Sequence, residues 1–410
     1  MDRTPNALLR QVRKSMDLSL DDFACAVRRA GDELGEPNDC SKRHVVRWES
    51  GETRTIRPIY RRALRHLTGR TFEQLGFVEY GSSADLSRRD VLVSVAATGL
   101  PQVAHMAAGR RVGASLVEQM RARTVRLRRL DDYLGGADTY RVYAAEVEAT
   151  AALVEHADYV QAVGRDLMAL LAEQAQQAGW AAFDIGDHQA AHRHYMTSLS
   201  AASTSGANDI AANSLAYVAY QLTSTGRPAA EVSTASCRQA TGGGRVRALL
   251  HSRAAYSHAR AGDITQAQRD LDIAAQAITA DASGAPDWAA WVDGREVAIM
   301  AGRCWAELHR PLRAIAALEP ALANYDPTHA RDRALYSTWL ADAYVDAGEP
   351  EQAAAVTLSA LDIAAGVGST RPVERAAQVV ARLAPHRRLP LVAEAFERCA
   401  EQRAVSSSPG

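Results

Sequence analysis

Apolar residues recur at helical spacing through the first 80 residues of the chain. Leu8, Leu9 and Val12 share one face of a helix predicted over 4–16. Ser19 is a suitable N-cap for a second helix, LDDFACAVRRA, because its hydroxyl can accept from amides of the first turn. The same reasoning predicts two further short helices, one running from Ser41 to Trp48 and one opened by Pro58 and ending near Leu67.

From residue 115 onward the pattern is helical and is interrupted by glycine at intervals. The clearest stretch is 248–278, in which one helix is followed by Gly262 and Asp263 and then by a second helix. Small residues, Ala255 and Ala267, fall where the two helices must approach closely. Similar units begin at residues 172, 212, 248, 295 and 334. This recurrence predicts an array of helical hairpins, each packed on its neighbours.

The two patterns together predict an all-α protein with more than one domain. At 410 residues the chain is too long for a single compact core. Residues 115–160 are expected to add a degenerate helix pair and residues 373–403 a capping pair. The predicted domains are a helical bundle (1–80), a linker helix (81–114), a solenoid of helix pairs (115–403) and a disordered tail (404–410).

Charge is distributed unevenly along the chain, although the formal net charge is only -1. Residues 41–70 contain 9 basic and 2 acidic side chains, whereas the 330 residues after residue 80 contain 32 basic and 36 acidic ones. A small basic domain attached to a mildly acidic one predicts an anionic partner for the basic domain.

Cysteine usage and hydropathy bear on the compartment. The cysteines are odd in number, far apart and without a CxxC spacing, which argues against a disulfide framework or a zinc site and fits a reducing cytosol. The N-terminus is polar, and no run of about 18 apolar residues occurs. We therefore expect a cytoplasmic protein with no membrane partner.

The stretch CSKRHVVRWESG, which begins at Cys40, is typical of a helix built to contact DNA. Lys42, Arg43 and Arg47 can share one face of the helix, while Val45 and Trp48 point the other way into a small core. An α-helix fits the major groove of duplex DNA, and residues near its N-terminus reach base edges. Arg54 and Arg57, which follow the next turn, are expected to add phosphate contacts.

Residues 5–77 resemble the Cro/CI-like (XRE-type) helix-turn-helix domain. LSLDDFACAV is similar to the scaffold helix of that family, and CSKRHVVRWESG is similar to its recognition helix. The resemblance implies that Arg13 pairs with Glu49. It also implies that Lys42, Arg43, His44 and Arg47 face an operator in double-stranded DNA. Two features differ from the family pattern: Leu20 replaces a glutamine, and the connection between the two helices is about ten residues long instead of about four.

The hairpin units resemble tetratricopeptide repeats, whose unit is about 34 residues long. A DNA-binding domain on such an array is similar to the peptide-sensing regulators of Gram-positive bacteria and to actinobacterial regulators. This resemblance implies a homodimer and a concave groove that holds a peptide, a small signal molecule or a protein. The residues expected to face that groove are Trp180, Asp184, Asn213, Tyr220, Tyr256, Arg260 and Arg303.

Two other functions remain open on the sequence. One is a protein-interaction adaptor that does not bind DNA. The other is a metal-dependent enzyme that uses His188, His192 and His194, which occur together in HQAAHRH. No glutamate follows these histidines in the HExxH manner, so a general base is lacking. The expectation is therefore a transcription regulator that is not an enzyme and needs no metal or other cofactor.

Overall fold

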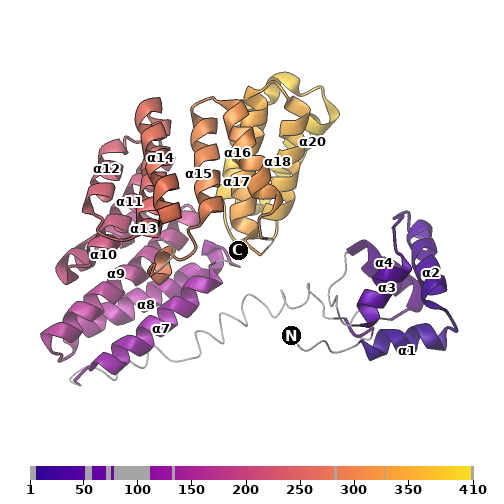
Figure 1. Ribbon diagram of the computed structural model, residues 1–410, viewed down its shortest axis with the longest axis horizontal. Helices are drawn as coiled ribbons and strands as arrows, with labels where there is room; N and C mark the ends of the chain where they lie inside the picture. The colour runs from indigo at the N-terminus through magenta and orange to yellow at the C-terminus, as the bar shows by residue number, and fades with distance from the viewer. Residues whose placement is uncertain are drawn as a thin grey trace. The chain divides into compact units, whose positions relative to one another are not determined.

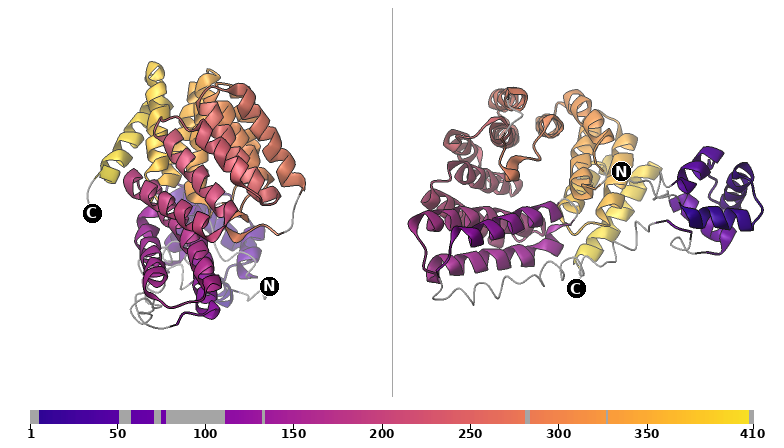
Figure 2. Two further views of the ribbon diagram at one scale, coloured as in Figure 1. Left: turned by 90° about the vertical axis from the view of Figure 1, so that its left-hand side faces the viewer. Right: turned by 60° about the horizontal axis from the view of Figure 1, so that its bottom comes forward.

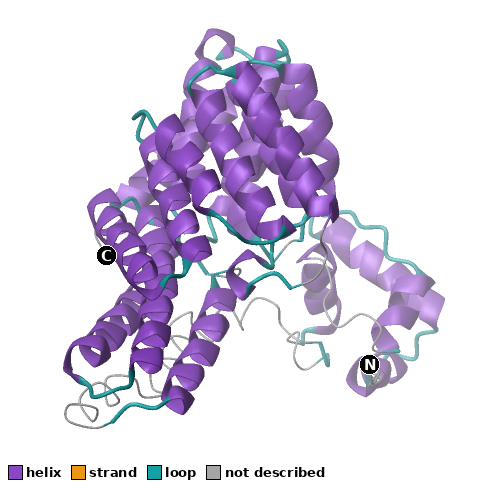
Figure 3. Cartoon of the chain, turned by 60° about the vertical axis from the view of Figure 1, so that its left-hand side comes forward, coloured by secondary structure: helices purple, strands orange, loops and turns teal. Residues whose placement is uncertain are grey.

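The computed structural model describes residues 6–50, 58–70, 75–77, 111–131, 134–280, 284–326 and 328–407. It divides the chain into two compact units, an N-terminal unit (residues 1–91) and a C-terminal unit (residues 92–410). All regular elements in the described residues are helices, and one isolated bridge joins Arg111 to Asp158 (Figure 3). The prediction of an all-α protein is confirmed.

The described part of the N-terminal unit contains short helices whose ends are fixed by side-chain caps. Asn6 Oδ1 accepts from the amide of Leu9, and Ser19 Oγ accepts from the amide of Asp22. These bonds satisfy amides that have no partner within the helix, so the first two helices begin close to where the sequence predicts. The helices are α1 (Ala7–Ser15), α2 (Leu20–Glu33), α3 (Lys42–Glu49) and α4 (Pro58–Thr68) (Figure 1).

A single small core holds these helices together. Leu9 of α1, Phe23 and Val27 of α2, Val45 of α3 and Leu64 of α4 are all fully buried. The connection between α2 and α3 is also tied down. Asn38 in this connection donates to the carbonyl of Val27 and accepts from the amide of Cys40. The long connection noted in the sequence is therefore bonded to α2.

The C-terminal unit is a succession of helices that run side by side as hairpins (Figures 1 and 2). Its helices are α7 (Ala114–Leu130), α8 (Gly136–His156), α9 (Gln161–Asp184), α10 (His188–Ser205), α11 (Asn208–Ser224), α12 (Ala230–Gln239), α13 (Gly244–Arg260), α14 (Ile264–Ala280), α15 (Gly294–Glu307), α16 (Pro311–Ala323), α17 (Ala330–Asp346), α18 (Pro350–Ala364), α19 (Arg371–Arg382) and α20 (Pro390–Ser407). Short 3-10 turns lie at η1 (Asp287–Ala289) and η2 (Ala384–His386).

The turns within the hairpins require a left-handed backbone. Gly186, Gly262 and Gly348 follow α9, α13 and α17 with φ of +84°, +77° and +79°, which glycine adopts without a steric penalty. His309 occupies the equivalent turn after α15 with φ of +52°. A non-glycine residue can therefore close the same hairpin, although the sequence gives no signal for it.

Glycine also allows the two helices of a hairpin to approach closely. A Cβ atom added to Gly179 of α9 would lie 2.5 Å from the ring of Tyr195 on α10. A Cβ atom added to Gly302 of α15 would lie 2.5 Å from Leu318 on α16. The small residues of the sequence pattern therefore mark helix–helix contacts, as predicted.

The array closes on itself at one carboxylate. Asp184, at the end of α9, is fully buried. Its Oδ2 accepts from the amide of Gly136 at the start of α8 over 3.0 Å, and its Oδ1 accepts from Ser369 Oγ over 2.8 Å. The amide of Ala137 also donates to the carbonyl of Gly368. The loop before α19 is thereby bonded to the first helices of the unit.

Two further segments were predicted from the sequence, a linker helix over 81–114 and a disordered tail over 404–410. The linker helix predicted within 81–114 falls largely outside the described residues. Helix α20 continues to Ser407, so residues 404–407 extend the last helix and are not part of a disordered tail. No helix in the described parts of the chain is long and apolar enough to cross a membrane.

Candidate functional site

Helix α3 has one buried face and one exposed face. Val45 is fully buried and Trp48 is 2% exposed. The Trp48 ring meets the rings of Tyr60 and Phe77 edge-on, with centroids 5.5 and 6.2 Å away. These contacts fix the rotation of α3 about its own axis. Val46 and Arg47, which lie between Val45 and Trp48, therefore face away from the core.

The cations of α3 lie on the exposed face. Lys42, Arg43 and Arg47 are all exposed. Lys42 Nζ lies 2.9 Å from Asp21 Oδ2, but both side chains are more than half exposed. An exposed pair of this kind contributes only about 0–1 kcal/mol, so a phosphate can displace Asp21 at little cost. The face is therefore suited to a polyanion.

His44 has a different place from the one expected. Its Nδ1 accepts from the amide of Ser41 over 3.1 Å, which completes a reciprocal cap at the start of α3. Its ring packs against Tyr60 and Trp48 with centroids 5.5 and 6.1 Å away. His44 is half-buried and positions the helix start, so it does not project with the three cations.

Arg13 and Glu49 form a buried, two-pronged ion pair. Arg13 Nε donates to Glu49 Oε1 over 2.6 Å, and Nη2 donates to Oε2 over 3.2 Å. The hydrogen bond to Glu49 raises the pKa of Arg13 above its usual value. The pair ties the end of α3 to α1, as the family resemblance implies. Arg54 and Arg57 lie outside the described residues, so the structure does not place them.

The C-terminal unit contains a cavity of about 390 Å³ on the inner side of the array. Ligand pockets in proteins range over about 300–1,000 Å³, so this one suits a compact molecule. Helices α9, α11, α13, α15, α17 and α19 all contribute to its lining. The wall combines aromatic rings with guanidinium groups, among them Trp180, Tyr217, Tyr220, Arg253, Arg303 and Arg371.

Two guanidinium groups converge on Tyr220. Arg303 Nη2 donates to the Tyr220 hydroxyl over 2.9 Å, and Arg371 Nη2 donates to the same oxygen over 2.8 Å. Burial would raise the pKa of Tyr220, but the charges of Arg303 and Arg371 outweigh burial and lower it. The Tyr220 oxygen is therefore held in a strongly positive environment.

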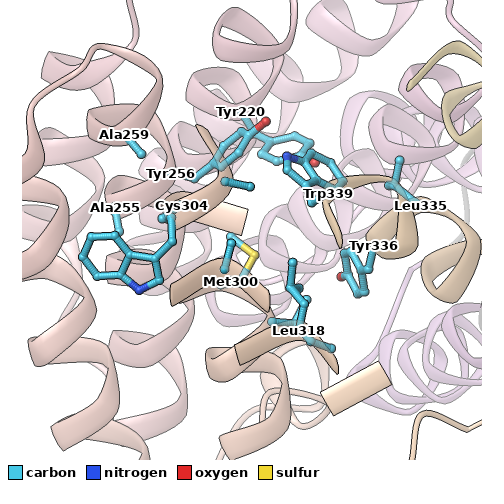
Figure 4. Packing of buried hydrophobic residues seen from close by; sticks show 14 of the residues in the cluster. Tyr220, Ala255, Tyr256, Ala259, Met300, Cys304, Leu318, Leu335, Tyr336 and Trp339 are labelled. Atoms are coloured by element: carbon cyan, nitrogen blue, oxygen red, sulfur yellow. The ribbon is translucent and has the colours of Figure 1, made fainter. Parts of the chain in front are cut away.

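Arg303 is buried among rings, and no carboxylate in the described parts of the chain lies within ion-pair distance of it. It is 2% exposed, and its Cζ lies 4.1 Å from the Trp339 ring centroid and 4.7 Å from that of Tyr256. Figure 4 shows Tyr220, Tyr256 and Trp339 grouped on neighbouring helices. A desolvated cation–π contact contributes about 2 kcal/mol, whereas burying an unpaired ion costs several kcal/mol. The rings thus offset only part of the cost of this charge.

Arg253 adds a third cation to the same wall. Its Nη1 donates to Asn213 Oδ1 over 2.9 Å, and its Cζ lies 4.3 Å from the Tyr217 ring centroid. Among the described residues, neither Arg253 nor Arg303 has an acidic oxygen within ion-pair distance. Of the three arginines of this wall, Arg371 lies within ion-pair distance of a carboxylate, that of Asp184, whereas Arg253 and Arg303 are bonded to neutral groups.

Several carboxylates also line the cavity, and Asp131, Asp332 and Glu296 are bonded within the protein. Arg331 Nη1 lies 3.0 Å from Asp131 Oδ2, and Arg331 Nε lies 3.1 Å from Asp332 Oδ1. Burial, reinforced by the nearby charge of Asp332, raises the pKa of Glu296 to about 7. The Tyr336 hydroxyl donates to Glu296 Oε1 over 2.9 Å. Burial thus makes Glu296 a weaker acid than an ordinary glutamate, although the charge of Arg303 acts in the opposite direction.

Three of the seven residues expected to face a ligand do line the cavity. These are Trp180, Tyr220 and Arg303. The expectation is corrected for Asp184 and Asn213. Asp184 bonds the loop before α19, and Asn213 donates to Gln176 Oε1 within the helix packing.

Tyr256 and Arg260 are also corrected. Both lie beside the cavity and bond the carboxylate of Glu307, the hydroxyl of Tyr256 over 3.3 Å and Arg260 Nη1 over 2.7 Å. Arg375 approaches the same carboxylate over 3.4 Å. Glu307 therefore binds Tyr256, Arg260 and Arg375 through one carboxylate, and none of these side chains lines the cavity.

The histidines of HQAAHRH do not form a metal site with an acidic or cysteine partner. His188 and His192 are exposed on α10, and His194 is half-buried against the ring of Tyr140. Within the described residues, the group of three possible ligands whose atoms lie within 4.8 Å of one another is a different one: Cys237, His251 and Asp270.

That group comes from three helices, so no sequence spacing signals it. Cys237 is on α12, His251 on α13 and Asp270 on α14. Sulfur, imidazole and carboxylate donors suit Zn²⁺. However, Asp270 already lies 2.7 Å from His251 Nδ1 and 3.6 Å from His258 Nε2. These hydrogen bonds and charges alone account for the arrangement as a tie between α13 and α14.

The geometry defines a class of protein: a helical protein with a basic exposed helix in one unit and a cation-lined cavity in the other. No protein-family model matches the chain, and no curated protein matches it.

Proposed function

We propose that the protein is a sequence-specific, DNA-binding transcription regulator. The observation that carries the proposal is the division of α3 into a buried face and a face that presents Arg43 and Arg47 to solvent. The Arg13–Glu49 pair fixes the end of the same helix. A rigid helix with exposed guanidinium groups is what direct readout of guanine in the major groove requires. In this proposal the N-terminal unit is a helix-turn-helix domain.

The second unit supplies the regulatory input in this proposal. Its hairpins are proposed to be tetratricopeptide-like repeats, and the cavity between them is the ligand site. A ligand changes DNA affinity only if it binds two arrangements of the protein unequally. A homodimer is proposed as well, because two recognition helices on two half-sites multiply the modest affinity of one.

The proposal is tested by selecting bound fragments from a random DNA pool and measuring their affinity in gel shifts. Arg43→Ala with Arg47→Ala should weaken binding to the selected site by roughly 10- to 100-fold for each lost base contact. Arg29→Ala is the matched control, because Arg29 is an exposed arginine on α2. The binding of Arg29→Ala should stay within a few-fold of wild type.

The alternative, an adaptor that does not use DNA, makes the opposite prediction. It requires that no fragment is enriched and that the protein does not bind DNA even at low salt, where phosphate contacts are strongest. That result would contradict the proposed function.

A further inference from the structure

Arg303 carries a positive charge that is buried with no anion within ion-pair distance among the described residues. Arg303 is 2% exposed, and its Nε has no hydrogen-bond partner in the described structure. Its Nη1 and Nη2 are used by weak or neutral acceptors, Met300 Sδ and the Tyr220 hydroxyl. A buried charge is normally paired with an opposite charge. The missing partner here can come from outside the protein.

The cavity gives such a partner access to Arg303. Arg303, Arg253 and Arg371 all line it. Arg371 Nη1 has no hydrogen-bond partner either, although it lies 3.5 Å from Asp184 Oδ1. Ser252 Oγ, also in the lining, is buried without a partner. Three residues of the lining, one each on α13, α15 and α19, therefore carry a buried polar atom that the protein leaves without a hydrogen bond.

The rest of the lining indicates the shape of the occupant. Trp180 and Tyr217 lie 5.7 Å apart between ring centroids, and Trp180 also contacts the ring of Tyr220. Trp288 and Tyr336 add further rings to the lining. Aromatic walls favour flat ligands through stacking and edge contacts. The volume of about 390 Å³ is at the lower end of the range for ligand pockets and suits a compact ring system.

We propose that the cavity binds a compact, flat organic anion whose carboxylate or phosphate group is held by Arg303, Arg253 and Arg371. The planar guanidinium groups donate paired hydrogen bonds to the oxyanion, while its ring system packs against Trp180 and Tyr217. This inference rests on the proposed function, in which the cavity is the regulatory ligand site, and it adds the chemical class of the ligand. Both aromatic carboxylic acids and aryl phosphates belong to that class.

The test uses the full chain and three probes of the same size: naphthalene carboxylate, naphthyl phosphate and the neutral naphthalene carboxamide. Binding is followed by calorimetric titration and by quenching of tryptophan fluorescence, to which Trp180 contributes. One or both anions should bind at least about tenfold more tightly than the carboxamide, because only they pair with the buried charges. The two anions compared with each other distinguish a carboxylate ligand from a phosphate ligand.

Arg303→Met tests the residue directly, since methionine keeps an unbranched side chain out to about the position of Nε and removes the charge. It should weaken anion binding by roughly 10- to 100-fold and leave the affinity for the carboxamide unchanged. Arg313→Met is the matched control. Arg313 also lies over a ring, that of Trp305, but does not line the cavity. It should bind the anions like wild type.

Arg253→Met provides a second test if Arg303→Met does not fold. The proposal is overturned if the anions and the carboxamide bind equally, if none of the probes binds, or if every variant that folds keeps wild-type affinity for the anions. These measurements need no DNA, whereas the test of the proposed function needs no ligand. Each proposal can therefore fail without the other.

Discussion

Arg371 and Tyr220 are 151 positions apart in the sequence, yet Arg371 Nη2 donates to the Tyr220 hydroxyl over 2.8 Å. Arg371 opens α19, near the end of the array, and Tyr220 lies in α11, near its middle. The same arginine lies 3.5 Å from Asp184 of α9. One side chain thus links the closure of the array to the wall of the cavity, so stability and ligand binding are expected to be coupled there.

Asp184→Ala should destabilise the C-terminal unit strongly. It leaves Arg371 without its buried carboxylate and the amide of Gly136 without an acceptor, and removing one partner of a buried ion pair costs about 3–5 kcal/mol. Urea unfolding followed by circular dichroism measures the loss. Asp166→Ala, at an exposed position of the same helix, is the control and should change the stability by less than about 0.5 kcal/mol. Equal losses in the two variants would show that Asp184 does not hold the closure.

Glu296→Gln should change how stability depends on pH. The pKa of Glu296 is raised from 4.5 to about 7, so the folded state favours the neutral acid. The corresponding stability is fully present below pH 4.5 and is lost as pH rises to about 7, a loss of roughly 3 kcal/mol. Glutamine cannot ionise and keeps an acceptor for Tyr336.

The prediction for Glu296→Gln therefore concerns the difference between the unfolding free energies of variant and wild type as a function of pH. The variant and the wild type should have similar stability below pH 4.5, and the variant should become progressively the more stable of the two as pH rises from 4.5 to about 7. Urea unfolding over a pH series measures this difference. If the two unfolding free energies differed by the same amount at every pH, ionisation of Glu296 would not be what destabilises the wild type.

Glu49→Ala should loosen α3 much more than Asp21→Ala does. Glu49 is buried and paired with Arg13, whereas Asp21 is exposed and paired with Lys42. The first change removes the carboxylate that Arg13 binds through two nitrogens and costs about 1–3 kcal/mol, while the second costs about 0–1 kcal/mol. Hydrogen exchange of the α3 amides measures the difference locally. Similar protection in the two variants would mean that the buried pair does not fix this helix.

Gly302→Ala should destabilise the α15–α16 hairpin, because the added methyl group would lie 2.5 Å from Leu318. Overpacking of this kind costs about 1–3 kcal/mol. Gly294→Ala is the matched control on the same helix, since a Cβ atom there meets nothing within 4 Å. It should be neutral or slightly stabilising. If the two variants have the same thermal midpoint, the close approach of the helices is not what requires glycine at Gly302.

Local signals predicted much of the fold. Ser19 and Ser41 begin helices because a cap needs only a side chain and an amide that are three positions apart in the sequence. Gly262 marks a hairpin because the turn needs a residue with a left-handed backbone at that one position. The faces of α3 also followed from spacing, since Val45 and Trp48 must lie together on any helix.

Long-range contacts could not be predicted in this way. Asp184 appeared to face a ligand, but the curvature of the whole array brings Ser369 to it from 185 positions away. Arg253 and Arg371 were missed because nothing near them in the sequence shows that their helices meet. Their role depends on how successive hairpins turn, and small differences in packing accumulate along an array.

The meeting of Gly135 and Gly368 has a consequence for how this protein can evolve. A Cβ atom on Gly135 would lie 2.1 Å from the carbonyl oxygen of Gly368, so backbone touches backbone where the first and last hairpins join. An open solenoid can gain or lose a unit at modest cost, because each unit contacts only its neighbours. Here a duplicated or deleted hairpin would separate the two glycines and pull the joined ends apart. The number of hairpins between Gly135 and Gly368 is therefore constrained by this contact.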